Sequence, residues 1–390
     1  MTSVASSAPA IQAAVEAIAR DWASARPERQ RRRELDPADF TRLVDAGFLL
    51  TGVPVEAGGI IESIPASTRA VAELLRTLAH ADSSVALVAA MHPVVLATTG
   101  WLALPEAPPP YTDAWAAQRR WAFQTATEGA WWGTITSEPG SGGDMRKTKA
   151  VARRAEDGTF RLSGQKHFGS GSGITAFMMT TALPEREAEP DIFFIDMRGL
   201  PWDGSAGVTL TAPWDGFGMT ATQSHAMLFA DMPVQRVDWP DFGARTEAAL
   251  PVGGFGACLF TAVIVGIVEE ALATATRQLG TRYASLRPYE QVEWTRARTE
   301  GWLIEQAYEG MLRATETANG RGTLIGKTAI AELAESVLAR LPKVVGGGAY
   351  SRQSPFGFWY EDVRALGYLR PPWGFAYDQL HAAAAPLPTD

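Results

Sequence analysis

Hydrophobic side chains recur at helical spacing through the first third of the chain. Within residues 10–22 the apolar positions are spaced by four, three and four, which places them on one helix face. A second helix is expected after Asp36, which can cap it, with Pro37 in the first turn and Gly47 at its end. Residues 67–101 predict two more helices that break near "HADSS", the second apolar nearly all round and hence buried.

The pattern then changes to short runs with the composition of strands. Residues 148–168 alternate between apolar and polar positions and carry the hairpin signal Asp157-Gly158. The runs "AFMMTTA" (176–182) and "DIFFIDM" (191–197) are rich in residues that favour strands. Short strands with turns continue to about residue 240, which predicts a small sandwich or barrel.

Helical patterning returns after Gly253. Helices are expected over about 256–279, 291–319 and 325–345, with further helical pieces after "VRALGYL". This order predicts an α+β fold in three parts. They are an N-terminal helical domain (1–130), a middle β domain built as a small barrel or sandwich (131–243) and a C-terminal domain like a four-helix bundle (244–390).

Composition agrees with a folded protein and disfavours several partners. The 390 residues are 46% hydrophobic and carry a net charge of −8, which argues against nucleic acid as the main ligand. The apolar run 252–268 is short for a bilayer and meets two glutamates, so we expect a buried helix and no membrane partner. One cysteine, Cys258, and five scattered histidines predict no metal site. No signal-peptide pattern is visible, so a cytoplasmic location is expected.

Two glycine-rich loops carry a family resemblance. "SEPGSGGD" (137–144) is similar to the pattern Thr/Ser-Glu-Pro-Gly-x-Gly-Ser-Asp, and "SGQKHFGSG" (163–171) is similar to Asn-Gly-x-Lys-x-Trp-Ile-Thr-Asn-Gly. The stretch "GFGMTATQSHAMLFADMPV" (216–234) looks like a third family strand. With the order of domains, these motifs make the chain resemble the acyl-CoA dehydrogenase superfamily over nearly its whole length. Each loop alone is also compatible with ordinary β-turns.

The resemblance implies a bound flavin, FAD or alternatively FMN. In the family the first loop holds the flavin ring, and the second supplies an aromatic residue and a hydroxyl group. Paired glycines near the end of the last long helix approach FAD from a neighbouring subunit, which implies a homodimer or homotetramer; a helix cap is the alternative for them. The candidate cofactor-binding residues are Thr134, Thr136, Ser137, Gly142, Gly143, Phe168, Ser170, Arg287, Gly346 and Gly347.

The position of the family's catalytic base has no carboxylate. Relatives place a glutamate eight residues after the aspartate of an Arg-Asp pair, and counting from Asp362 leads to Arg370. Another branch of the superfamily, which includes dibenzothiophene monooxygenase, needs no such base. There a histidine and a serine hydrogen-bond the flavin, and "KHFGSG" is similar to that branch. The candidate catalytic residues are therefore Arg370, His92 and Ser170; for His92 a role in the core is the alternative.

Three functions remain open at this point. The first is an FAD-dependent oxidation of an acyl-CoA or related thioester, with an electron-transfer flavoprotein as a possible partner. The second is a two-component monooxygenase that receives reduced flavin from a reductase. The third is a flavin-binding scaffold without catalysis. Gly143 and Trp373 are the candidate substrate-binding residues. For Trp373 the reason is that "YLRPPWG" lies where the family has its catalytic turn, and that its prolines stiffen the chain.

Overall fold

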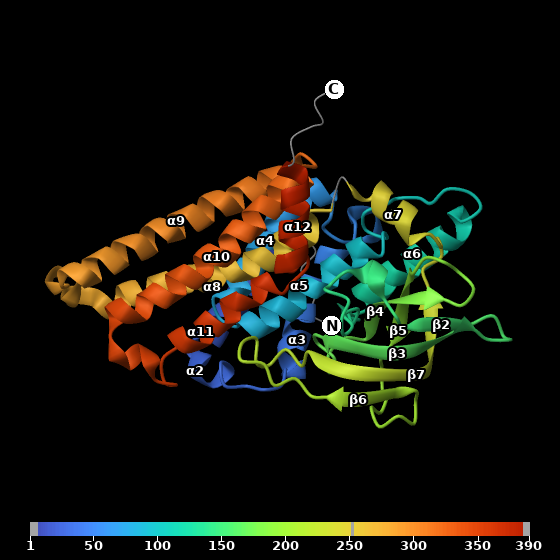
Figure 1. Cartoon of the computed structure of the whole chain (residues 1–390), viewed down its shortest axis with the longest axis horizontal. Coiled ribbons are helices and arrows are strands. Elements are labelled where there is room, and N and C mark those ends of the chain that lie inside the picture. Colours follow the sequence, from blue (N-terminus) through green and yellow to red (C-terminus); the bar gives the residue numbers. More distant parts are fainter. Residues whose placement is uncertain (1–6, 251–252, 385–390) are drawn as a thin grey trace.

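A computed structural model describes residues 7–250 and 253–384 of the chain. The helices in this part are α1 (Ala8–Ser24), α2 (Arg26–Arg29), α3 (Pro37–Asp45), α4 (Ile64–Ala79), α5 (Ser83–Thr98), α6 (Thr112–Thr127), α7 (Phe242–Ala248), α8 (Phe255–Leu279), α9 (Pro288–Glu316), α10 (Gly320–Val345), α11 (Phe356–Val363) and α12 (Trp373–Ala384). The strands are β1 (Trp132–Thr134), β2 (Val151–Arg154), β3 (Phe160–Gly169), β4 (Phe177–Pro184), β5 (Asp191–Asp196), β6 (Val208–Ala212) and β7 (His225–Arg236). Figure 1 shows the strands gathered at one end and the long helices α8, α9 and α10 at the other.

The strands form a small closed barrel, as the alternating pattern predicts. β4 pairs with β2, β2 with β3, β3 with β7, β7 with β5, and β5 with β4, so the ring closes. β1 adds to β4 in parallel, and β6 adds to β7. Leu162, Phe193 and Phe229 fill the interior, because alternate side chains of each strand point inward. The hairpin at Asp157-Gly158 is confirmed as the connection between β2 and β3.

Local capping explains where several helices begin and end. α3 starts at Pro37, and the Asp36 carboxylate accepts a hydrogen bond from Ala38 N at 2.9 Å. Gly47 follows with φ +80°, a backbone conformation that suits glycine. α9 begins three residues before the expected start, because Glu290 accepts from the backbone N–H of Arg287 in a capping box. α6 was not set apart by the sequence pattern.

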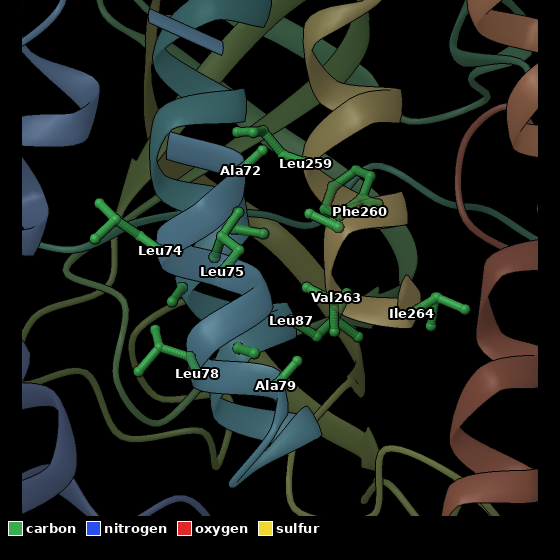
Figure 2. Close-up of a cluster of buried hydrophobic side chains, with 14 of the residues drawn as sticks. Ala72, Leu74, Leu75, Leu78, Ala79, Leu87, Leu259, Phe260, Val263 and Ile264 are labelled. Carbon is green, nitrogen blue, oxygen red and sulfur yellow. The ribbon is translucent and has the colours of Figure 1, made fainter. Parts of the chain in front are cut away.

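Helix α8 is the core of the helical part. Its apolar stretch is long enough to cross a bilayer by length and composition, yet 78% of it is buried inside the fold, which confirms the expected buried helix. Figure 2 shows Leu75 and Ala79 of α4 on the side toward α8, which carries Phe260 and Val263. α9 and α10 pack lengthwise on the other side of α8, while α5 lies between α8 and β1. The three domain boundaries remain a prediction.

Candidate functional site

The first motif forms a loop that is anchored to the barrel. Lys166 of β3 is fully buried and donates to Glu138 Oε1 at 2.5 Å, to Thr148 Oγ1 at 3.1 Å and to Thr181 O at 2.5 Å. Burial raises the pKa of Glu138, but donors from Lys166, Thr148 and Lys149 N outweigh it and bring that pKa below its usual value. The ion pair therefore fixes the loop on β3.

Three glycines of the same loop have positive φ values, and two of them differ in the space beside their backbone. Gly140, Gly142 and Gly143 have φ values of +79°, +61° and +83°. A Cβ atom at Gly143 would lie 2.6 Å from Cγ of Pro372, while a Cβ at Gly142 would have nothing within 4 Å. Pro372 belongs to the segment "YLRPPWG" (368–374), which we call the C-terminal turn. This turn lies against the loop at Gly143, where the family pattern has a serine.

Arg370 reaches this loop from the C-terminal turn. Its guanidinium donates to Gly143 O at 2.8 Å, to Thr136 Oγ1 at 2.6 Å and to Ser137 Oγ at 3.2 Å. Burial lowers the pKa of Arg370 to about 10, with Asp144 acting in the opposite direction. No carboxylate forms an ion pair with it within the part of the chain that the structure describes. The group is a protonated cation held by neutral acceptors.

An aromatic wall stands beside the loop. Phe168 is 57% exposed and has a φ of +58°, a strained conformation for a bulky residue. Its ring lies edge-on to Trp214 at a centroid distance of 6.1 Å, and Phe217 nearby in sequence is 88% exposed. Exposed aromatic rings held in place by strained backbone are typical of ligand-binding surfaces.

Ser170 belongs to a chain of buried hydroxyl groups. Its Oγ lies 2.8 Å from Ser224 Oγ, which lies 2.7 Å from Thr222 Oγ1. Gly171 N donates to Thr222 O at 2.8 Å, so the second motif is tied to the segment before β7. The structure therefore brings Thr136, Ser137, Gly142, Gly143, Phe168, Ser170 and Arg370 to one end of the barrel.

His92 is not open to this site. It is fully buried in α5, Nε2 lies 3.0 Å from Leu49 O, and Nδ1 accepts from Trp132 N at 3.2 Å. Burial lowers its pKa to about 3, with the hydrogen bond to Leu49 acting in the opposite direction. Both ring nitrogens are satisfied by backbone, so the geometry supports the core alternative, and its catalytic role stays an untested prediction.

Three predicted cofactor residues lie at the far end of the bundle. Arg287 caps α9, and Gly346, with φ +106°, and Gly347 follow the end of α10. Lys327 of α10 donates to Pro371 O at 2.8 Å, so the other end of the same helix contacts the C-terminal turn. At 1.5 Å per residue, Lys327 and the end of α10 at Val345 are roughly 27 Å apart. Within one chain these three residues do not join the site, and their role across a subunit boundary remains a prediction.

The remaining candidates flank the site. Thr134 ends β1, and its buried Oγ1 has no hydrogen-bond partner among the described residues. Trp373 opens α12, packs against Gly367 and stacks on Tyr377 at 6.0 Å. Trp214 and Ser224 were not singled out from sequence as site residues, although they lie in or next to the "GFGM" stretch that carried part of the resemblance.

Part of the chain matches a known family, and several known proteins are similar to it in sequence. Residues 133–232 match the family model of the acyl-CoA dehydrogenase middle domain. The amino sugar nitrososynthase DnmZ of Streptomyces peucetius is 29% identical over 58% of this chain, and the match spans 59% of its own length. Dibenzothiophene monooxygenase of Mycolicibacterium goodii is 26% identical over 74% of this chain and 66% of its own.

The fold is also similar to that of proteins whose structures are known. KijD3 in complex with FMN and a dTDP-linked amino-keto sugar superposes with a TM-score of 0.79 at 21% identity, covering 97% of this chain and 93% of that one. At this identity the likeness concerns the fold alone.

Proposed function

We propose that this chain, whose residues 133–232 match the acyl-CoA dehydrogenase middle domain, is a two-component monooxygenase that oxidises a heteroatom of a small molecule. FMN is the proposed cofactor, which a partner flavin reductase delivers in reduced form; an FMN complex of a protein with this fold supports this. Reduced flavin, when bound, supplies the two electrons with which one atom of dioxygen goes to substrate and the other to water.

Arg370 is the observation that carries this proposal. Dehydrogenation of a thioester needs a carboxylate that takes the α-proton. A guanidinium with a pKa of about 10 holds its proton at neutral pH and does not serve as that base. Glu138 is committed to Lys166, and Asp144 accepts from Arg146 N at 2.9 Å in its own turn. Acyl-CoA oxidation, which the motifs made the first expectation, is therefore not what we propose.

The residues present suit a flavin ring. The open side of Gly142 leaves room for a planar group close to the backbone. Phe168 offers an exposed ring to stack against it. The orphan hydroxyl of Thr134, and the hydroxyls of Ser137 and Ser170, supply polar atoms near the edge of that space.

Each group then has a distinct task. The Arg370 guanidinium places a positive charge beside Ser137, where it stabilises negative charge on a bound ligand. Phe168 and Trp214 exclude water from one side of the site. The Glu138–Lys166 ion pair keeps the loop in a single position, so that its donors need no reorganisation.

The test is a pair of anaerobic titrations followed by oxygen. We expect tighter binding of reduced than of oxidised FMN, no bleaching of bound flavin by acyl-CoAs, and substrate-dependent uptake of oxygen when a flavin reductase is added. Bleaching by an acyl-CoA would instead establish the dehydrogenase. Tight flavin binding without either reaction would leave a scaffold, and both outcomes would overturn the proposal.

The assembly and location are part of the same proposal. Tyr289, Val292, Trp302 and Leu303 of α9 are exposed apolar residues on the outer helix of the bundle. Such residues support a homodimer or homotetramer, for which light scattering after gel filtration is the test. We also propose a cytoplasmic location, to be tested by fractionation of the producing cells.

A further inference from the structure

The segment that precedes β7 is strained. Met219 and Gln223 have φ values of +50° and +47°, in the left-handed region that residues other than glycine rarely adopt. Such a conformation is unfavourable and persists only where the surroundings hold it. We call Gly218–Ser224 the clamped turn.

A buried carboxylate on α11 holds the clamped turn from one side. Asp362 Oδ1 accepts from Met219 N at 2.6 Å, and its Oδ2 accepts from Ser83 Oγ at 2.5 Å. At Gly218 the backbone lies so close to Glu361 O that a side chain would not fit. Asp362 therefore joins the start of α5 to the clamped turn through two hydrogen bonds.

Two further hydrogen bonds hold the clamped turn, one from α5 and one from the segment after α2. Ala221 N donates to Ser84 Oγ at 3.3 Å, and Thr220 Oγ1 donates to Arg32 O at 2.9 Å. These contacts leave the turn fixed from the helical side of the molecule, with its strain compensated by hydrogen bonds.

The opposite side of the clamped turn carries the site. Ser224 Oγ lies 2.8 Å from Ser170 Oγ, and Thr222 O accepts from Gly171 N at 2.8 Å. Met219 O accepts from Trp214 Nε1 at 2.9 Å. Both the hydroxyl chain and the tryptophan of the aromatic wall therefore depend on where the clamped turn stands.

We propose that Asp362 is a positioning residue, which sets Ser170 and Trp214 against the bound flavin by holding the clamped turn. Asp362 itself contacts neither the 136–144 loop nor Phe168 in the hydrogen bonds of the described residues. Its effect passes through Met219 to Trp214 on one branch and through Thr222 and Ser224 to Ser170 on the other. This inference rests on the proposed flavin function.

The test compares FMN affinity among variants at and away from Asp362. We expect Asp362→Ala to weaken FMN binding about tenfold, and Asp362→Asn, which keeps an acceptor for Met219 N, to weaken it only about threefold. Ser83→Ala is expected to lie near Asp362→Asn. Glu293→Gln is the matched control, because Glu293 is also buried and accepts from Arg340 Nη1 at 2.9 Å, but lies in α9. Its FMN affinity is expected to equal that of the wild type.

A double-mutant comparison separates positioning from general loss of structure. If Asp362 acts through Ser224, then Asp362→Ala combined with Ser224→Ala binds FMN no more weakly than Asp362→Ala alone. Fully additive losses, or an Asp362→Ala protein that folds and binds FMN within twofold of the wild type, would overturn the proposal. If Asp362→Ala does not fold, Asp362→Asn and Ser83→Ala answer the same question.

Amide hydrogen exchange provides a readout that needs no flavin. We expect faster exchange in peptides covering 213–224 and Gly171 for Asp362→Ala, and unchanged exchange there for Glu293→Gln. If the wild type binds no flavin, the proposed function fails, while exchange still reports whether Asp362 holds the turn. Unchanged exchange in Asp362→Ala would refute the structural step.

Discussion

Two kinds of cation hold the candidate site, two buried lysines and the half-buried Arg370, and they differ in how many of their N–H donors bond within the chain. Lys166 uses its three N–H groups on Glu138, Thr148 and Thr181, and Lys327 uses its three on the carbonyls of Leu366, Leu369 and Pro371. Arg370 has five donors and spends three of them on described residues, all neutral acceptors. The lysines build the site, whereas the arginine keeps capacity for a ligand.

The largest expected effect is a loss of stability at low pH, and it arises from His92. Like the two lysines, His92 has its polar atoms hydrogen-bonded within the chain. Its folded pKa of about 3 lies below the ordinary 6.5, so the unfolded chain binds the extra proton in between. The contribution of His92 to the free energy of unfolding is fully present above pH 6.5. It is lost as the pH falls toward 3, at about 1.4 kcal/mol per pH unit. Urea unfolding of wild type and His92→Gln across this range checks it. Equal slopes for the two proteins would contradict the assignment.

The second effect comes from removing Lys166 from its ion pair with Glu138. Lys166→Met leaves Glu138 buried without its counter-charge, and we expect a loss of about 3–5 kcal/mol in unfolding free energy. Lys327→Met is the matched control, because it removes hydrogen bonds to carbonyls only and is expected to cost about 1–3 kcal/mol. Urea denaturation measures both. Similar losses would mean that the Glu138 charge does not set the difference.

The third effect concerns Arg370, where binding is expected to change more than stability. Arg370→Met should weaken reduced FMN about tenfold and oxidised FMN less, since only the reduced ring carries appreciable negative charge at neutral pH. Arg370→Lys should restore part of the preference. Anaerobic titration of each variant with both forms of FMN is the measurement. If a variant loses stability but keeps the preference for reduced FMN, then Arg370 stabilises the fold, as the lysines do, and does not contact the ligand.

How far the sequence leads depends on the distance between interacting residues. The start and end of α3 were predictable, because Asp36 and Gly47 act on their own neighbours. Counting from Asp362 located Arg370, yet its contact with Thr136 spans 234 positions and depends on how the C-terminal turn meets the barrel. The role of the "GFGM" stretch as a clamped turn was likewise invisible, because its partners lie on α5 and α11.

The smallest effect tests the contact between the 137–144 loop, which Lys166 anchors, and the turn that carries Arg370. This contact joins Gly143 and Pro372. Gly142→Ala is the matched control: its Cβ has free space, so it bears only the strain of a positive φ, about 1 kcal/mol. Gly143→Ala bears the same strain and in addition pushes on Pro372, so we expect about 1 kcal/mol more in urea unfolding. Pro372→Ala should recover that extra loss in the Gly143 variant and nothing in the Gly142 variant. If Gly143→Ala costs no more than Gly142→Ala, the C-terminal turn does not press on the loop. Arg370 would then reach Ser137 from a turn free to move, and its preference for reduced flavin would depend on ligand-induced closure instead of a preformed charge.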